Sequence, residues 1–142
     1  MTAIRLTTNP IELLNLGCGS QKLGVGIDIL DAGQEIVWDI RKGIPLPDRS
    51  VKEFHTSHFL EHLTREELYP LFDEIRRVAI PGALMTIIVP HGDTDEADFL
   101  GHLSYWDERR VRGIVLGLRG AIELVSLVRP GMEMKVVLRI KE

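Results

Sequence analysis

The 142-residue sequence has a single cysteine, Cys18, so the chain cannot form an internal disulfide. It has no apolar run near the ~18 residues that a membrane-spanning helix needs, and its first residues lack the basic segment and apolar core of a signal peptide. Low-complexity tracts and internal repeats are also missing. We therefore expect one globular domain over residues 1–142, cytoplasmic and without a membrane partner.

Charge is distributed unevenly along the chain. Residues 1–100 carry 9 basic and 16 acidic side chains, whereas residues 101–142 carry 8 basic and 5 acidic ones. The acidic body disfavours nucleic acid as a non-specific partner. Four arginines in the C-terminal part could contact an anionic substrate, although a solvated helix face is the preferred interpretation: Arg109, Arg110, Arg112 and Arg119.

Short apolar runs alternate with turns and helical patterns, which predicts an α/β fold. The expected strands cover residues 11–16, 24–29, 35–40, 51–58 and 83–90, and residues 121–128 and 133–141 should form a closing antiparallel hairpin. A capping box at Thr64 and Glu67 predicts a helix that continues to about Ala79, with a kink or restart at Pro70. Pro81 and Gly82 should end it, and a second helix should cover residues 107–118.

Glycines and acids follow the expected strands at the points where those strands end. Gly17 and Gly19 come directly after the first strand, and glycine allows positive φ and a close approach of ligand to backbone. Asp28 ends the second strand and Asp39 the third, while Ser57 lies near the end of the fourth. Open parallel sheets bind ligands beyond these ends, and a carboxylate there can accept hydrogen bonds from ribose hydroxyls.

Only eight residues, 17–24, separate the first two strands, whereas a parallel crossover usually takes a dozen or more. The first crossover helix should therefore be missing or reduced to a turn. The sequence accordingly predicts a loop that relies on backbone N–H groups and two acids rather than on a helix N-terminus.

The ordered motifs LNLGCGS, GIDI, WDIRKGIPLPDRSV, HTSHFLEHL and EIRRVAIPGALMTIIVP resemble those of the class I S-adenosylmethionine-dependent methyltransferases, and among them the small methyltransferase type 11 members. The resemblance covers residues 11–140. It implies a Rossmann-like, doubly wound, mostly parallel sheet and S-adenosyl-L-methionine as the cofactor. It also implies methyl transfer to a small-molecule or biopolymer acceptor, which the sequence does not identify.

The resemblance also implies roles for individual residues. Gly17, Cys18 and Gly19 would form the loop under the methionine part of the cofactor, and Asp28 would hold the ribose. Ile29 would pack on the adenine, Asp39 and Ile40 would meet its edge, and Ser57 and His58 would lie near the sulfonium. Cys18 is interpreted as structural rather than nucleophilic, because no base is placed near it.

The segment 58–62 offers a second chemistry. His58, Glu61 and His62 would share one face of a helix, with His91 and His102 later in the chain. Some relatives bind a divalent metal at this place with a related pattern. The preferred interpretation is instead that Glu61 and His62 are hydrogen-bonded helix-start residues, so no metal is expected.

Methyl transfer from a sulfonium depends chiefly on positioning of the acceptor. If the acceptor must lose a proton, His91 and His58 are the candidate bases. Tyr105 and Trp106 could cover the cofactor or simply pack a helix. The rival interpretation is a non-catalytic Rossmann-like module that binds the cofactor, or nothing, as a subunit of a larger assembly. An NAD-dependent enzyme is disfavoured, because no helix-opening GxGxxG is present.

Overall fold

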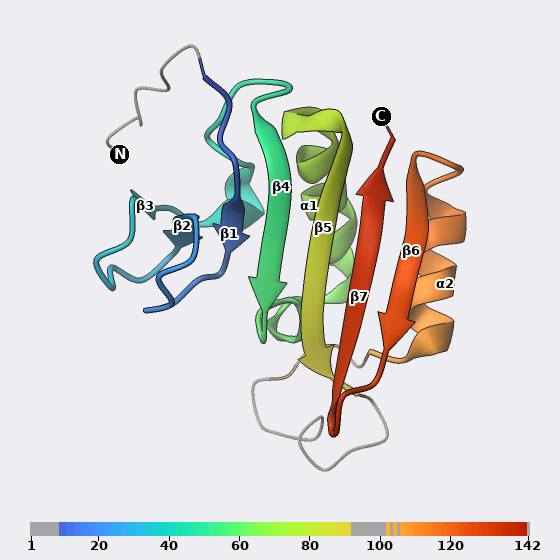
Figure 1. The fold of residues 1–142 in the computed structure, drawn as a ribbon. Coiled ribbons are helices and arrows are strands. Elements are labelled where there is room, and N and C mark those ends of the chain that lie inside the picture. The colour runs from blue at the N-terminus through green and yellow to red at the C-terminus, as the bar shows by residue number, and fades with distance from the viewer. Residues whose placement is uncertain (1–8, 92–101, 103, 105, 142) are drawn as a thin grey trace.

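The computed structural model describes residues 9–91, 102, 104 and 106–141, which build one seven-stranded sheet with helices packed against it (Figure 1). The strand order is β3-β2-β1-β4-β5-β7-β6. The strands are β1 (Leu14–Leu16), β2 (Val25–Asp28), β3 (Ile36–Val37), β4 (Val51–Ser57), β5 (Ala79–Pro90), β6 (Ile122–Val128) and β7 (Glu133–Ile140). The helices are α1 (Arg65–Val78) and α2 (Glu108–Gly117), with short 3-10 turns η1 (Ile40–Lys42) and η2 (Leu60–His62).

Strand direction follows the prediction. The pairs of β1 with β2, β2 with β3, β1 with β4 and β4 with β5 are parallel, and β7 pairs antiparallel with both β5 and β6. The chain winds outward from β1 in one direction and from β4 in the other, so the switch point lies between these two strands. The expected α/β fold, Rossmann-like and mostly parallel with a C-terminal hairpin, is confirmed.

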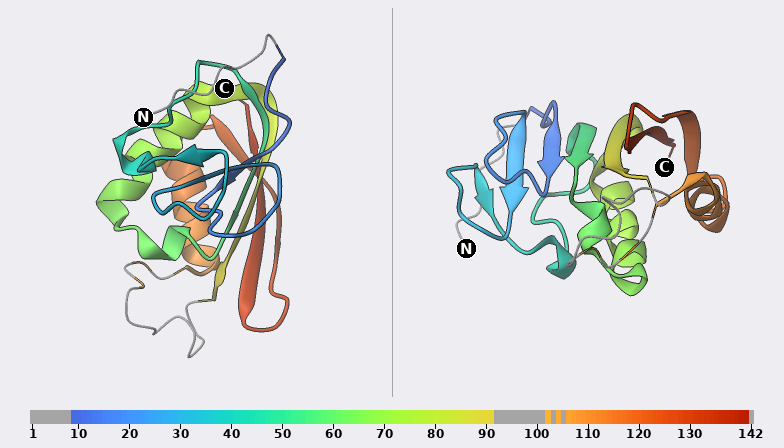
Figure 2. Two further views of the ribbon diagram at one scale, coloured as in Figure 1. Left: turned by 90° about the vertical axis from the view of Figure 1, so that its left-hand side faces the viewer. Right: turned by 90° about the horizontal axis from the view of Figure 1, so that it is seen from below.

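The first crossover contains no helix, as its length predicted. Residues 17–24 form turns between β1 and β2, and the two strands are adjacent and parallel. The helices α1 and α2 lie over the same face of the sheet, which the two turned views make clear (Figure 2). Among the described residues, no α-helix covers the opposite face.

Helix α1 begins where the capping box predicted. The Thr64 side chain accepts a hydrogen bond from the Glu67 N–H, and the Glu67 side chain accepts one from the Thr64 N–H. Of the kink or restart expected at Pro70, the restart is wrong, because α1 runs through this residue as one element. Pro70 and Glu66, whose carbonyl would have paired with residue 70, are both exposed, so water can take the place of the lost bond.

Apolar residues at helical spacing bury one face of α1 against the sheet. Leu68, Leu71, Phe72, Ile75 and Val78 are all buried, with exposed fractions of 3% or less. They meet the buried side chains of the central strands, Phe54, Met85, Ile87, Val136 and Leu138. This packing anchors α1 on the face of the sheet formed by β4, β5 and β7.

Three element boundaries differ from the expectation by three residues or more, and one of them is the start of β1 at Leu14 rather than at residue 11. β5 starts at Ala79, directly after α1, and Pro81 and Gly82 lie inside it, at a register shift against β4 where Gly82 has a φ of 95°. β3 ends at Val37, so Asp39 does not end a strand but caps η1 through the Arg41 N–H. In the described part of the chain, no helix is both long and apolar enough to cross a membrane.

Candidate functional site

A pocket of about 160 Å³ lies at the carboxyl ends of the parallel strands, on the β2 and β3 side of the switch point. Its walls come from the ends of β1 and β2, from the start of η1 and from the segment after β4. They contain Gly17, Ile27, Asp28, Ile29, Trp38, Asp39, Ile40, Arg41, Phe59, His62 and Leu63. The structure thus brings together five of the residues predicted for cofactor binding: Gly17, Asp28, Ile29, Asp39 and Ile40.

Asp28 ties the glycine loop to the second strand. Its Oδ2 atom accepts a hydrogen bond from the Gly19 N–H at 2.8 Å, and its Oδ1 atom accepts one from the Leu30 N–H at 3.2 Å. Each carboxylate oxygen can accept a further hydrogen bond. Asp28 therefore shapes the loop and still has acceptor capacity for a hydroxyl pair.

The amides of the glycine loop have partners within the chain. The N–H groups of Gly17 and Cys18 both donate to the Ile27 carbonyl oxygen, at 2.9 and 3.3 Å, and that of Gly19 donates to Asp28. A backbone amide has one proton to donate. These three N–H groups are therefore used within the chain, so Gly17 and Gly19 offer a ligand shape rather than free donors.

Asp39 is held by Arg41, a residue that the sequence interpretation did not place in the site. Arg41 donates from Nε to Oδ1 and from Nη2 to Oδ2, both at 2.9 Å, and its backbone N–H donates to Oδ1 at 3.0 Å. These hydrogen bonds from Arg41 lower the pKa of Asp39. The carboxylate stays ionised, and Oδ2 has one remaining direction in which to accept a ligand donor.

Phe59 covers the backbone of Gly17. A Cβ atom built at Gly17 would lie 2.1 Å from Cγ of Phe59, and Gly17 has a φ of 63°. Only glycine fits under this ring without displacing it. The ring also limits the pocket, since about 160 Å³ is below the ~300 Å³ lower end usual for small-molecule sites.

The other predicted cofactor residues, Cys18, Gly19, Ser57 and His58, do not line the pocket. Cys18 is 6% exposed, and its Sγ atom is packed against Gly26. Burial is the main cause that raises the pKa of its thiol, which agrees with a structural role. Ser57 ends β4, and His58, with a φ of 53°, directs its ring to Glu133 on β7.

His91 faces a carboxylate rather than the pocket. Its ring is 4% exposed, and Nε2 lies 2.9 Å and 3.0 Å from the two carboxylate oxygens of Glu108 at the start of α2. The hydrogen bond with His91 lowers the pKa of Glu108. Neither candidate base, His58 or His91, lines the pocket. The histidine that does is His62.

Glu61 is buried beside three histidines. It is 2% exposed, and within the described chain neither of its carboxylate oxygens has a hydrogen-bond partner. Oε2 lies 3.6 Å from Nδ1 of His58, and burial is the main cause that raises the Glu61 pKa. The interpretation of Glu61 as a hydrogen-bonded helix-start residue is therefore wrong for its side chain.

The same cluster contains the donor types of a transition-metal site. One ligand atom each from Glu61, His62 and His102 lies within 4.8 Å of the other two. The rings of the two histidines meet edge to face, with their centroids 4.8 Å apart. The ligand atoms of a tetrahedral zinc ion lie about 3.4 Å apart, which is within this limit. The Ser104 N–H donates to the Glu61 carbonyl at 3.1 Å, which brings His102 to η2.

The sequence motifs did not predict three apolar residues of the pocket wall, which are Trp38, Phe59 and Leu63. Trp38 follows β3, and its Nε1–H donates to the Gly43 carbonyl at 2.9 Å. Trp38 could have been predicted from the sequence, because it directly precedes Asp39, a predicted ligand residue. Nothing local to the sequence predicts that Phe59 folds back over Gly17. Trp106 is 1% exposed and donates to Ser104, so it packs the core, and Tyr105 lies outside the described residues.

No protein-family model matches the sequence, and no curated protein sequence matches it either. Solved structures do resemble the fold. A SAM-dependent methyltransferase from Aquifex aeolicus is 21% identical with a TM-score of 0.68, over 93% of this chain and 83% of that one. The 1,6-didemethyltoxoflavin-N1-methyltransferase of Burkholderia thailandensis, solved with S-adenosylhomocysteine, is 11% identical with a TM-score of 0.72, over 95% and 73%.

A third similar structure is the 16S rRNA (adenine(1408)-N(1))-methyltransferase from Catenulisporales acidiphilia, solved with SAM. It is 15% identical with a TM-score of 0.68, over 94% of this chain and 86% of that one. One of these proteins acts on a small molecule and another on ribosomal RNA, so the shared fold does not define an acceptor. The chain has the fold of the class I S-adenosylmethionine-dependent methyltransferases.

Proposed function

We propose that the protein binds S-adenosyl-L-methionine at the pocket beside the switch point and transfers its methyl group to an acceptor. The observation that carries the proposal is the joint position of Gly17, Asp28 and Asp39 around one pocket, at the carboxyl ends of β1, β2 and β3. The fold is that of proteins with this activity, and the site lies where open α/β sheets bind nucleotides.

The residues present fit the adenosine part of the cofactor best. Asp28 has acceptor capacity for the ribose hydroxyls, and Asp39 has one oxygen direction for the adenine amine. Ile29, Ile40 and Trp38 offer apolar wall for a flat base. The methionine part would lie over Gly17, where the ring of Phe59 now packs, so binding should move this ring.

When bound, the cofactor supplies an activated methyl group, and the task of the protein is to hold the acceptor in line with it and to exclude water. Phe59 and Leu63 would exclude water from the pocket. His62 is the histidine of the wall, and its imidazole could take a proton from an acceptor. The acceptor is a small molecule or a biopolymer.

Thermal stabilisation by S-adenosylhomocysteine tests the proposal. Ligand at about a hundred times its Kd should raise the free energy of unfolding by about 2.7 kcal/mol, or Tm by roughly 5–10 °C. Homocysteine and NAD serve as ligand controls, and neither should shift Tm. No shift with saturating S-adenosylhomocysteine in a folded sample would overturn the proposal.

Transfer itself needs a second measurement. Incubation with methyl-labelled cofactor and pools of small molecules, RNA and protein should label at least one pool. Binding of S-adenosylhomocysteine without labelling of any pool would favour the alternative, a non-catalytic cofactor-binding module of a larger assembly.

A further inference from the structure

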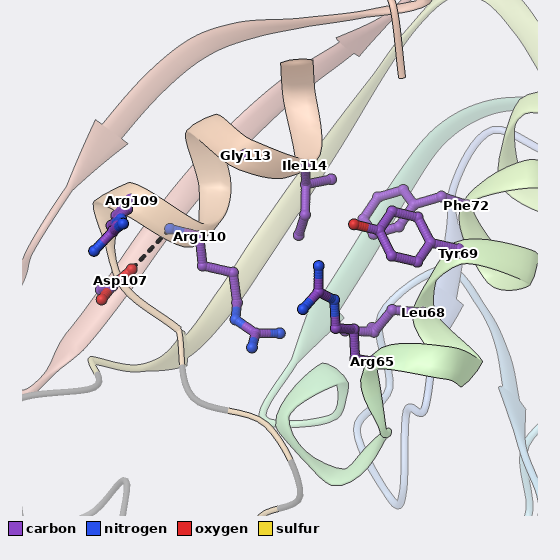
Figure 3. A pocket seen from close by; sticks show the side chains of 9 residues that line it. All are labelled: Arg65, Leu68, Tyr69, Phe72, Asp107, Arg109, Arg110, Gly113 and Ile114. Atoms are coloured by element: carbon purple, nitrogen blue, oxygen red, sulfur yellow. Dashed lines mark hydrogen bonds between the residues drawn. The ribbon is translucent and has the colours of Figure 1, made fainter. Parts of the chain in front are cut away.

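A second and larger cavity, of about 430 Å³, lies between the N-terminal halves of α1 and α2 (Figure 3). It shares no lining residue with the pocket proposed for the cofactor. Its walls are Arg65, Leu68, Tyr69 and Phe72 from α1, and Asp107, Arg109, Arg110, Gly113 and Ile114 from α2 and its cap. The volume falls within the ~300–1,000 Å³ range of small-molecule sites.

Two arginines meet across this cavity. Figure 3 shows the guanidinium groups of Arg65 and Arg110 turned toward each other from opposite helices, with the side chain of Arg109 further out beside Asp107. In the described chain, neither Arg65 nor Arg110 has a side-chain ion pair or hydrogen bond. By contrast, Arg41, Arg77 and Arg139 each contact a carboxylate.

The position of both arginines makes their positive charge costly. Arg65 is the first residue of α1, and Arg110 is in the first turn of α2, where its backbone N–H donates to the Asp107 side chain at 2.7 Å. Helix N-termini carry partial positive charge, so cations there are unfavourable and anions are favourable. The Asp107 carboxylate is used as the α2 cap. Two guanidinium groups and two helix N-termini therefore face one space, and Asp107 is the one acid among the residues that line it.

The remaining wall of the cavity is apolar. Leu68, Phe72 and Ile114 are buried under it, with exposed fractions of 3%, 1% and 8%. Tyr69 is 40% exposed, and Figure 3 shows its ring beside Phe72 with the hydroxyl directed toward the space between the helices. A ligand could lay a flat or apolar body on this wall and offer an anionic group to the arginines.

We propose that this cavity binds an organic anion, with a carboxylate or phosphate group held by Arg65 and Arg110 and an aromatic or apolar body against Tyr69, Phe72 and Ile114. Arginine presents a planar fork of donors that matches both anionic groups. The proposal does not depend on methyl transfer, because the cavity and the cofactor pocket share no residue.

Titration of the isotope-labelled full chain, followed by NMR, tests the proposal with four probes. Phenyl phosphate and benzoate carry both charge and ring, inorganic phosphate carries only charge, and benzyl alcohol carries only the ring. The first two should shift amide signals of the first turns of α1 and α2, and their relative affinities tell phosphate from carboxylate. Each single-feature probe should bind at least roughly tenfold more weakly.

Variants localise the effect. Arg65→Gln and Arg110→Gln should each weaken phenyl phosphate or benzoate binding by roughly tenfold or more. Arg112→Gln is the matched control, because Arg112 is exposed on the same helix and does not line the cavity. Binding of S-adenosylhomocysteine should be unchanged in all three variants, which separates this test from the cofactor proposal.

Three outcomes would overturn the proposal. One is the absence of α1 and α2 shifts with both ring-bearing anions, and another is an equal loss of affinity in Arg112→Gln. The third is binding that appears only after Asp93, Asp95, Glu96 and Asp98 are replaced by amides, since this would show that the arginines are matched by acids of the same chain.

Discussion

The Gly19 N–H donates a 2.8 Å hydrogen bond to Oδ2 of Asp28, so the acid that ends β2 holds the loop that follows β1. The same carboxylate accepts from Leu30 on the other side. Asp28 thus connects both sides of the first crossover at the mouth of the proposed cofactor pocket. A change at Asp28 should consequently affect the shape of the loop as well as contacts with a ligand.

We expect Asp28→Ala to weaken S-adenosylhomocysteine binding by about 1.5–3 kcal/mol, the range for lost hydrogen bonds to a charged group. Isothermal titration calorimetry measures this directly. Asp73→Asn is the control, since Asp73 carries the same charge on the exposed side of α1 and its side chain is 70% exposed. Unchanged affinity in Asp28→Ala would show that the ribose is placed elsewhere.

Gly17→Ala and Gly19→Ala form a matched pair. Both glycines have positive φ, 63° and 54°, so alanine should cost about 1–2 kcal/mol of stability at each. At Gly17 the added methyl also collides with Phe59, whereas nothing lies within 4 Å of the corresponding point at Gly19. Urea denaturation should therefore show an additional loss of about 1–3 kcal/mol for Gly17→Ala.

The Phe59→Ala background separates the two costs at Gly17. Without the ring, Gly17→Ala should lose only what Gly19→Ala loses, so a double-mutant cycle should give a favourable coupling between the two substitutions. Additive effects would mean that Phe59 does not pack on Gly17 in solution.

Much of the architecture could be predicted from local pattern. The apolar runs, the Thr64 and Glu67 capping box and the eight-residue gap each depend on neighbouring residues. The existence of the strands, the capped start of α1 and the crossover without a helix are confirmed, whereas β1 and β3 are shorter than their predicted ranges. The bulge at Pro81 and Gly82 depends on the pairing of β5 with β4, which no local pattern encodes. The end of β3 was missed because Asp39 bonds to the Arg41 N–H, a local alternative to strand pairing.

The site was predictable where it follows strand ends and unpredictable where it depends on distant contacts. Gly17 and Asp28 lie in the pocket because strand ends in a parallel sheet meet at one edge. The ring of His58 instead turns to Glu133, a residue 75 positions later, and Phe59 turns back over Gly17. Such choices between neighbouring side chains are made by tertiary packing.

The pH dependence of stability should reveal the buried Glu61. Burial raises its pKa, so between the ordinary glutamate range and the raised pKa the folded chain keeps a proton that the unfolded chain has lost. The contribution of Glu61 to stability should then fall as pH rises through this window. Glu61→Gln removes the titration, so the variant should gain stability relative to the parent with increasing pH.

Urea unfolding between about pH 4 and pH 8 measures the difference between the two proteins. Glu66→Gln, a substitution at an exposed site in the first turn of α1, provides the matched control. A difference between Glu61→Gln and the parent that does not change with pH would show that Glu61 is not desolvated in solution.

Zinc should stabilise the protein through the cluster of Glu61, His62 and His102. The buried carboxylate accepts no hydrogen bond within the described chain, and both imidazoles are close, so a cation would supply what the acid lacks. Equimolar zinc should raise Tm, and a chelator should reverse the rise. His102→Gln should reduce this rise in Tm, whereas the control His55→Gln on β4 should leave it unchanged. If zinc raised the Tm of Glu61→Gln as much as that of the parent, the cluster would not be the zinc site.

Because the first crossover has only eight residues, the part of the sheet that carries the proposed cofactor pocket is built from one short stretch of the chain. Closing so short a connection costs little loop entropy, and β3 adds only the pairs Ile27 with Ile36 and Asp28 with Val37. Such a small, lightly paired edge can open while β4, β5, β7 and β6 remain folded. Ligand occupancy should therefore slow hydrogen exchange at the amides of β2 and β3 far more than in the antiparallel half of the sheet.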